Sequence, residues 1–416
     1  MKGAGRTLAS FIGLGALGSA LLIAPAAAPA QTWKGEDLDR RMREAAWHFG
    51  PFLIQPSLVI SNAGIDSNLY YTRFKPVEDF TITAGPAATV YVPIHRKFVL
   101  SAYGSPQYVW YSKTAQERTW NYYFNGAAQL NLRNAFFSLD GVYSDARERW
   151  NTEIDVRPRR TETGFGGSAL LKLAAKTSTQ LGYRVADYNY ESIEYQGANI
   201  NEELTHQESF ATFSMYYQSA ATRRLFLDFE YGRYEFEYEI QADLKNSESG
   251  VISGGIEFSE LGRRVRGRLR IGYKKFDVHN KDMPDYEGLV GDTQLSVRLA
   301  RMFTIRGSYL REVRFSLWLE YPYYIETVPG VGASVYPFPF IRLDYDYTHG
   351  RNSYPEIPGT LLTRYDEYDT HSGAVYFRIL RNTAIGFIAS WWSRNSNIPG
   401  EDDERTFYGF NLTYDF

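Results

Sequence analysis

Four arginines occupy every second position of one short segment: Arg264, Arg266, Arg268 and Arg270. Apolar residues and one glycine lie between them, and a period of two is typical of a β-strand. On a strand the four guanidinium groups would lie on one face, about 7 Å apart. Two uses of such a row stay open: a ladder of ion pairs that stiffens a wall, and a basic stripe that guides anionic solutes.

Other charged residues lie on the polar faces of neighbouring segments. Acids that could pair with the row are Asp228, Glu230, Glu235, Glu257 and Asp292; further positions of this kind are Arg184, Arg298, Arg306, Arg342, Arg378, Asp140, Asp344 and Asp346. In a membrane-spanning wall, an arginine that faces lipid costs about 2–4 kcal/mol at the midplane. We therefore expect these residues to line a hydrated interior.

Signals for catalysis are weak. The six histidines, His48, His95, His206, His279, His349 and His371, lie at or near expected turns, loops or strand ends, and no two have a metal-ligand spacing. No serine stands in a nucleophile-elbow context. The carboxylates of Asp344 and Asp346 could do acid–base work, but a solvated lumen does not favour it. We expect no enzyme activity, no catalytic residue, no metal site and no cofactor.

The elements that would hold these residues are strands. Period-two alternation predicts eighteen of them, near 52–61, 79–93, 97–112, 117–132, 135–148, 161–174, 178–192, 205–219, 222–239, 247–259, 263–278, 284–299, 302–315, 322–331, 337–348, 363–380, 382–395 and 403–416. Short turns alternate with longer polar loops, such as 62–78, 149–160, 193–204 and 349–362. Such alternation is typical of outer-membrane barrels, and closure removes the sheet edges that lipid excludes. The predicted fold is all-β: a transmembrane antiparallel up-and-down β-barrel of about eighteen strands with a short N-terminal helix.

The alternation also assigns faces. Phe137, Leu139 and Tyr143 are expected to face lipid, with Ser138 and Asp140 inside.

The strand near 222–239 has an apolar phase that slips at Tyr231 and Gly232. Leu225 and Phe229 would point outwards before the slip and Phe236 after it. A glycine at a phase slip predicts a β-bulge.

The first thirty residues have the pattern of a secretory signal peptide. Lys2 and Arg6 form a positive start, an apolar or small stretch follows, and Ala28 and Ala30 frame a cleavage motif. The alternative is a transmembrane anchor. The expected organisation is a signal peptide at 1–30, a periplasmic helical segment at 31–50 and the barrel at 51–416. The helical segment would be a leader into the first strand or a partial plug of the barrel mouth.

Composition narrows the class further. Without Lys2 and Arg6, 43 Lys and Arg residues remain against 48 Asp and Glu, a net charge of −5, which gives no general basic surface for nucleic acid. The chain has no cysteine, which excludes a disulfide scaffold and thiol chemistry. Its 33 Tyr, 26 Phe and 8 Trp fit the aromatic girdles of a barrel. The soluble alternative, a pair of β-sandwich domains, leaves the signal pattern and the alternating turn lengths unexplained.

The last residues form one more period-two strand, with Phe410, Leu412, Tyr414 and Phe416 on its apolar face. This ending resembles the last strand of Gram-negative outer-membrane barrels, whose terminal Phe the barrel-assembly machinery reads. The resemblance implies an integral outer-membrane protein of a Gram-negative bacterium. Its partners would include outer-membrane lipid and the assembly machinery.

Two segments near the start of the barrel, from Gly64 to Tyr71 and from Asp79 to Pro86, resemble the β-barrel porin-2 family of outer-membrane proteins. In that family the first strand ends in an Asp, Asn, hydrophobic, aromatic stretch, and the second begins with a Pro-Gly-like segment. Here the order is Gly85 then Pro86. Members are often associated with exopolysaccharide gene clusters, so the resemblance, over about 50–416, implies a conduit for secreted polysaccharide with a periplasmic export partner.

The expected function is a porin-like passive channel for polysaccharide, with the arginine row as the best-placed wall for an acidic glycan. One rival is a general diffusion porin for small solutes, and another is a plugged structural or adhesion barrel. The external loops reach only about fifteen residues, which is short for the inward constriction loop of trimeric porins. We therefore expect a monomer.

Overall fold

The computed structural model describes residues 38, 41–95, 97–153, 155–258, 264–318, 321–356, 363–380 and 382–416. The expected signal peptide and residues 31–37 lie outside these ranges. Within them, no helix is long and apolar enough to cross a membrane.

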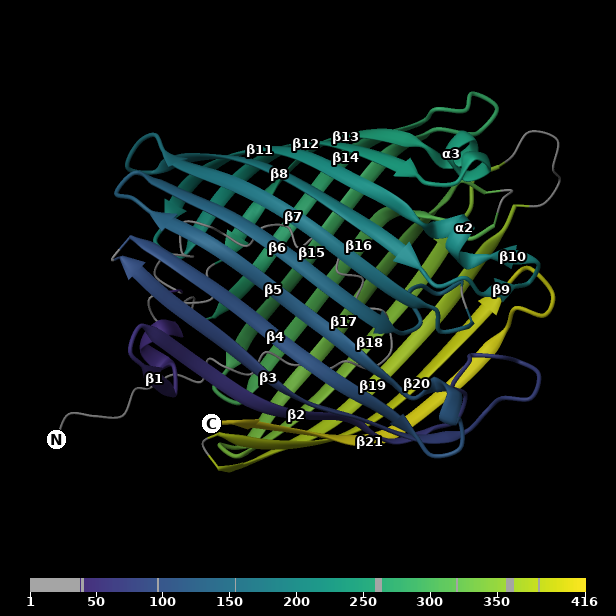
Figure 1. Ribbon diagram of the computed structural model, residues 1–416, viewed down its shortest axis with the longest axis horizontal. Coiled ribbons are helices and arrows are strands. Elements are labelled where there is room, and N and C mark those ends of the chain that lie inside the picture. Colours follow the sequence, from purple (N-terminus) through teal and green to yellow (C-terminus); the bar gives the residue numbers. More distant parts are fainter. Residues whose placement is uncertain are drawn as a thin grey trace.

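Eighteen long strands form one closed antiparallel barrel, which confirms the predicted fold class (Figure 1). The barrel closes where the last strand, β21 (Asp403–Asp415), pairs with the first long strand, β2 (Phe52–Asp66). Between them run β3 (Asp79–His95), β4 (Phe98–Tyr111), β5 (Thr119–Asn131), β6 (Ala135–Arg147), β7 (Arg159–Lys172), β8 (Thr177–Tyr190), β11 (His206–Ala220), β12 (Arg223–Phe236), β13 (Ser247–Phe258), β14 (Val265–Val278), β15 (Tyr286–Ala300), β16 (Phe303–Phe315), β17 (Tyr323–Phe338), β18 (Ile341–Ser353), β19 (Tyr365–Leu380) and β20 (Thr383–Ser396). Each of the eighteen predicted strands corresponds to one of these.

Short elements lie between the long strands. They are a helical turn at 41–44, β1 (Trp47–Phe49), a 3-10 turn η2 (Ala115–Glu117), the hairpin of β9 (Glu194–Tyr195) and β10 (Ala198–Asn199), and the helices α2 (Ile200–Leu204) and α3 (Glu239–Lys245). Both helices and the hairpin lie at the end of the barrel opposite the chain termini (Figure 1). We call that end, where the long loops gather, the mouth, and the end with short turns and both termini the inner end. Short turns face the periplasm in barrels of this kind.

Both boundaries at the turn between β17 and β18 differ from the prediction. β17 continues seven residues beyond the expected end at 331, and β18 starts four residues later than expected. The stretch at 329–332 contains one proline and two glycines, yet β16 pairs with it throughout and β18 pairs with most of it. Neighbouring strands thus override the weak local propensity.

The predicted faces hold along β6. Leu139 is 67% exposed on the outside, whereas Ser138 is buried inside. The bulge predicted at Tyr231 and Gly232 is wrong, because β12 pairs with both neighbours there without a register shift. Tyr231 is exposed on the outer face, so the alternation continues and turns Phe236 into the interior.

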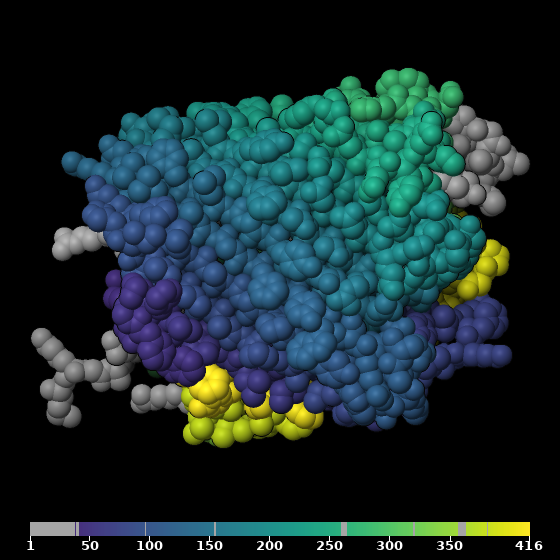
Figure 2. Space-filling model, in the orientation of Figure 1, coloured from purple at the N-terminus to yellow at the C-terminus, as the bar shows by residue number. Residues whose placement is uncertain are grey.

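The described part of the N-terminal segment lies against the outside of the inner end. β1 pairs with the start of β2, and the ring of Trp47 lies 5.7 Å from that of Phe416. Trp47 and Phe49 are exposed, and Figure 2 shows this purple segment on the surface beside the yellow C-terminal strand. The described residues of the segment therefore form a leader at the rim and no plug in the lumen.

Candidate functional site: the lumen and its mouth

The loop between β6 and β7, residues 148–158, folds inwards across the mouth. Its described residues contact β18, β20 and residues 316–317, all on the far side of the barrel from β6 and β7. We call it the inward loop. Eleven residues at about 3.3 Å each can reach roughly 18 Å out and back. The external loops were expected to be short for the role of an inward loop, yet this one folds inwards, and the expected monomer stays a prediction.

One anchor of the inward loop is Asp155. The guanidinium of Arg394, on β20, donates to its carboxylate at 2.7 and 3.2 Å. The same guanidinium donates to the carbonyl oxygen of Thr152 at 2.7 Å and also binds Asp403. Arg394 is only 2% exposed, so these charges meet away from bulk water. Buried pairs of this kind hold firmly because losing one partner strands the other.

The second anchor is Glu153, which is fully buried. The hydroxyl of Ser316 donates to its carboxylate at 2.8 Å, the backbone N–H of Leu317 at 2.9 Å and the hydroxyl of Tyr354 at 2.6 Å. Burial raises the pKa of Glu153, and these three hydrogen bonds together with nearby Arg364 offset part of the rise. Because all three donors are neutral, this anchor is weaker than the one at Asp155.

A third contact lies at the base of the inward loop. Arg149 donates to Asp155 at 2.7 Å, and its guanidinium lies over the rings of Tyr71 at 3.8 Å and Trp392 at 4.8 Å. Such cation–π contacts are worth about 0.5–2 kcal/mol each when they are shielded from water. The loop is thus fixed to three separate parts of the wall.

Two other loops close around the inward loop. Ile200 and Leu204 of α2 pack with Leu317 in one buried apolar cluster. Lys245 of α3 is fully buried and donates to Glu203 at 2.8 Å and to the carbonyl oxygen of Ser316 at 3.0 Å. The described residues of these loops therefore pack into one structure at the mouth.

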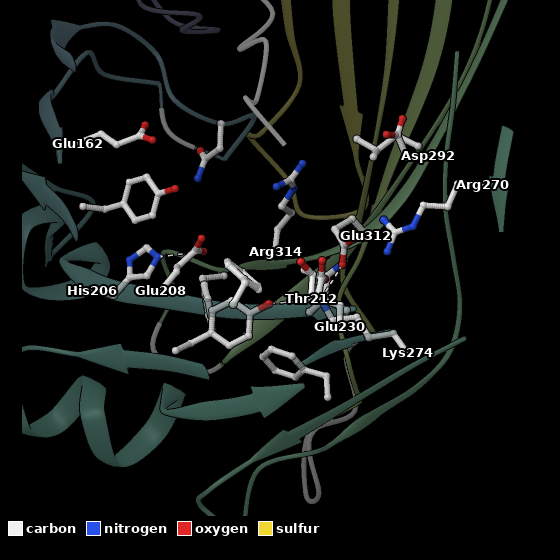
Figure 3. A pocket seen from close by; sticks show the side chains of 18 of the residues that line it. Glu162, His206, Glu208, Thr212, Glu230, Arg270, Lys274, Asp292, Glu312 and Arg314 are labelled. Atoms are coloured by element: carbon white, nitrogen blue, oxygen red, sulfur yellow. Dashed lines mark hydrogen bonds and ion pairs between the residues drawn. The ribbon is translucent and has the colours of Figure 1, made fainter. Parts of the chain in front are cut away.

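Below the inward loop lies a cavity of about 240 Å³. Its charged lining residues are Glu148, Glu162, Glu208, Asp228, Glu230, Asp292, Glu312, Arg160, Arg268, Arg270, Lys274 and Arg314. Figure 3 shows Glu230, Lys274 and Glu312 grouped inside it, with Arg270 beside Asp292. Lys274 donates to Glu312 at 2.7 Å, but seven acids face five bases, so the cavity is acidic on balance.

An aromatic cluster forms one wall of this cavity. Tyr234 lies 5.2 Å from Phe315, Phe236 lies 4.9 Å from Phe315, and Phe276 joins them. The sequence analysis missed this cluster because the supposed bulge turned Phe236 towards lipid. Unbroken alternation through Tyr231 was the signal that could have found it.

The structure divides the arginine row into two parts. Arg268 forms ion pairs with Asp228 at 2.6 Å and with Glu257 at 3.7 Å, and Arg270 donates to Ser253 at 2.9 Å. This half of the row is the ion-pair ladder. Arg264 and Arg266 lie nearer the inner end, outside that ladder.

The other predicted interior residues are distributed around the wall. Arg306 pairs with Asp346 at 2.8 Å, Arg342 with Asp344 at 2.9 Å, and Arg184 with Glu162 at 3.1 Å. Arg298 and Arg378 lie near the inner ends of β15 and β19, and Asp140 lies on β6.

Two groups of predicted residues lie on the outer face. The first is Glu235 alone, which pairs with Arg233 on that face at 2.6 Å, so its expected interior position is wrong. Of the terminal strand residues, Phe410 and Phe416 are exposed, and Leu412 and Tyr414 are partly exposed. Their role in assembly stays a prediction.

A family described as "Putative beta-barrel porin 2" matches residues 45–416, the whole barrel. The chain belongs to this family. The match confirms the resemblance seen in the sequence, and the protein is a porin-like β-barrel of the outer membrane. No curated protein matches the sequence.

Solved structures share the architecture of this porin-like barrel at low sequence identity. OccAB4 of Acinetobacter baumannii is 11% identical over 87% of this chain and 98% of its own, with a TM-score of 0.50. The outer membrane protein opdK of Pseudomonas aeruginosa is 9% identical over 87% and 98%, also with a TM-score of 0.50. The siderophore receptor PirA of Pseudomonas aeruginosa is 9% identical over 87% and 80%, with a TM-score of 0.44. At these identities the likeness to OccAB4 and opdK shows the fold alone.

Proposed function

We propose that the protein is a passive channel for hydrophilic solutes across the outer membrane of a Gram-negative bacterium. The inward loop would narrow its mouth and set the size of solute that passes. The supporting observation is that side chains of the opposite wall, Arg394 and Tyr354, hold this loop across the mouth.

The chemistry of the interior fits polar solutes. Barrels of sixteen to eighteen strands enclose an aqueous channel rather than a packed core. Carboxylates and guanidinium groups line the cavity below the inward loop, and charged groups need water or partners. Passage through such a lumen requires no covalent chemistry.

Export of a secreted polysaccharide is the finer form of this proposal. It is supported by the gene clusters with which relatives are associated and by the arginines at the inner end, which suit an acidic chain. Sugar stacking adds little support, because guanidinium groups already cover aromatic faces: Arg160 lies 3.5 Å from the ring of Trp150, and Arg224 lies 3.9 Å from that of Tyr216. General diffusion of small solutes fits the same interior.

Single-channel conductance in planar bilayers tests the proposal. The refolded barrel is compared with a variant in which 150–157 is replaced by a short Gly–Ser linker. We expect a steady conductance that increases in the variant, because its mouth lacks the constriction. A variant with the loop at 279–285 shortened is the control, since no described residue there binds the inward loop. Absence of conductance from both the refolded barrel and the linker variant would refute a passive channel.

A matched pair of probes separates the two kinds of solute. Liposome swelling in neutral oligosaccharides of increasing length gives the size limit. Free passage of monosaccharides with exclusion of longer oligomers would favour general diffusion. Entry of long oligomers, above all acidic ones, would favour a polysaccharide conduit.

A further inference from the structure

The inner end of the lumen gathers arginines from five strands. They are Arg264, Arg266, Arg298, Arg306, Arg342 and Arg378, each within four residues of the inner end of β14, β15, β16, β18 or β19. We call this group the arginine collar. It follows the rim along one side of the barrel, from β14 to β19, unlike the lengthwise row that the sequence suggested.

Part of the collar is neutralised within the wall. The guanidinium of Arg306 binds Asp346 at 2.8 Å and lies 3.7 Å from Asp344, which also binds Arg342 at 2.9 Å. Two cations and two carboxylates balance here. This side of the collar needs no external anion.

Arg264 and Arg298 are not balanced. The backbone N–H of Arg298 donates to the carbonyl oxygen of Arg264 at 2.7 Å, so the two residues lie directly opposite each other on neighbouring strands. The adjoining pairs, Val265 with Val297 and Arg266 with Ser296, continue the same register. Among the described residues, neither guanidinium has a hydrogen-bond or ion-pair partner.

Two like charges directly opposite each other destabilise a sheet. An anion held between them would remove the repulsion, and a guanidinium suits the task because it binds carboxylate or phosphate through two parallel N–H groups. Arg264 is exposed and Arg298 is partly exposed, so a solute can reach them. Arg266 adds a third cation on the same face, two residues further in.

We propose that Arg264 and Arg298, flanked by Arg266, form an anion-binding site at the inner end of the lumen. Its ligands are carboxylate or phosphate groups of solutes that enter from the periplasm. This inference rests on the proposed channel for its orientation and names the chemical class of the solute.

The charge of the rest of the lumen supports this position. Beneath the mouth, seven acids face five bases in the cavity lining. An anion is therefore attracted by the inner end and repelled by the acidic cavity beneath the mouth. Such an uneven field concentrates anions at one entrance and speeds their capture.

Equilibrium binding to the full mature chain in detergent tests the site. The probes are trigalacturonate, which carries three carboxylates, and inorganic phosphate, with maltotriose as the neutral control. In the variant Arg264→Gln/Arg298→Gln we expect at least tenfold weaker binding of the anions by isothermal titration calorimetry. The anion that binds more tightly shows whether the site prefers carboxylate or phosphate groups.

Arg223→Gln is the matched control. Arg223 is the first residue of β12, at the same end of the barrel, but it is exposed on the outer face. We expect its affinity for both anions to be unchanged. The inference is overturned if neither anion binds, if maltotriose binds equally well, or if Arg223→Gln weakens binding as much as the double variant.

The two proposals can fail separately. A protein that conducts but binds no anion would refute the site and leave the channel in place. A protein that binds trigalacturonate through Arg264 and Arg298 but never conducts would refute the passive channel and support the site.

Discussion

Replacement of Arg394 by glutamine should release the inward loop from the opposite wall. The change removes the charge while keeping much of the side chain. It leaves Asp403 buried without its cation and leaves Asp155 with Arg149 of its own loop as its remaining cation. Loss of one partner from a buried ion pair costs about 3–5 kcal/mol. One carboxylate belongs to the loop and the other to the wall, so about half of this, roughly 1.5–2.5 kcal/mol, acts on loop seating. The ratio of seated to released loop should therefore fall roughly 10- to 60-fold, at about 1.4 kcal/mol per factor of ten.

Single-channel recording measures this ratio. A released loop widens the mouth, so we expect Arg394→Gln to spend more time in a state of larger conductance. Polyethylene glycols that the parent channel excludes should enter the variant. The time that Arg394→Lys spends in the larger conductance state should lie between those of the parent channel and Arg394→Gln. Lysine keeps the charge, but its ammonium group lacks the planar fork that reaches both carboxylates.

Arg405→Gln is the control for damage to the barrel itself. Arg405 is also largely buried near the mouth and donates to Asp66 at 2.7 and 2.9 Å, but it binds no described residue of the inward loop. We expect its conductance to match that of the parent channel. If Arg394→Gln is folded and still has the parent conductance and the parent size limit, the ion pair with Asp155 does not hold the loop, and the reasoning is wrong.

Three further predictions concern pH and stability. Burial raises the pKa of Glu153 above its ordinary value of 4.5, so the seated loop prefers the protonated carboxyl. Seating of the loop is therefore strongest in acid. It weakens as the pH rises, until the carboxyl of the seated loop has also lost its proton. The larger conductance state should be more frequent at pH 7.5 than at pH 5, and Glu153→Gln should flatten this dependence; an unchanged slope would assign it to other groups. Gly267→Ala should lower the free energy of unfolding in urea by about 1–3 kcal/mol or more, because Gly267 has a φ of +116° and an added Cβ would lie 1.9 Å from a backbone oxygen. Gly250 has open space around it, so Gly250→Ala should change this free energy little. Arg268→Gln should also lower the free energy of unfolding, by about 3–5 kcal/mol, because it leaves the carboxylate of Asp228 without its cation. Its ion selectivity, measured by reversal potential, should differ less from that of the parent channel than the selectivity of Arg264→Gln/Arg298→Gln does.

The strands and their closure could be read from the sequence because the signal is local. Period-two alternation in a segment such as 135–148 needs no knowledge of its neighbours. Once eighteen such segments are present, the cost of an open edge in lipid leaves a closed barrel. The same reasoning placed the ladder of Arg268 and Asp228 inside, since an arginine facing lipid is costly.

Local reasoning failed where it stopped at one strand. The supposed bulge at Tyr231 followed from reading every aromatic residue as lipid-facing, yet Phe236 packs inside against Phe315 of β16. Glu235 was placed inside for the same reason, because the false phase slip moved it to the wrong face.

The mouth and the collar depend on which strands lie opposite or beside one another. In the sequence, Glu153 and Asp155 are two more acids in a polar loop. Nothing there marks Arg394, 239 residues further along the chain, as the partner of Asp155. Only closure of the barrel brings the loop and the far wall within hydrogen-bond distance. The sequence alone thus determined the barrel, its eighteen strands and the faces of most of them, because those follow from short-range periodicity and the exclusion of polar edges from lipid. The tertiary structure decided the path of the inward loop, the partner of each buried charge and the unbalanced pair of Arg264 and Arg298, because these arise from register and from contacts across the lumen.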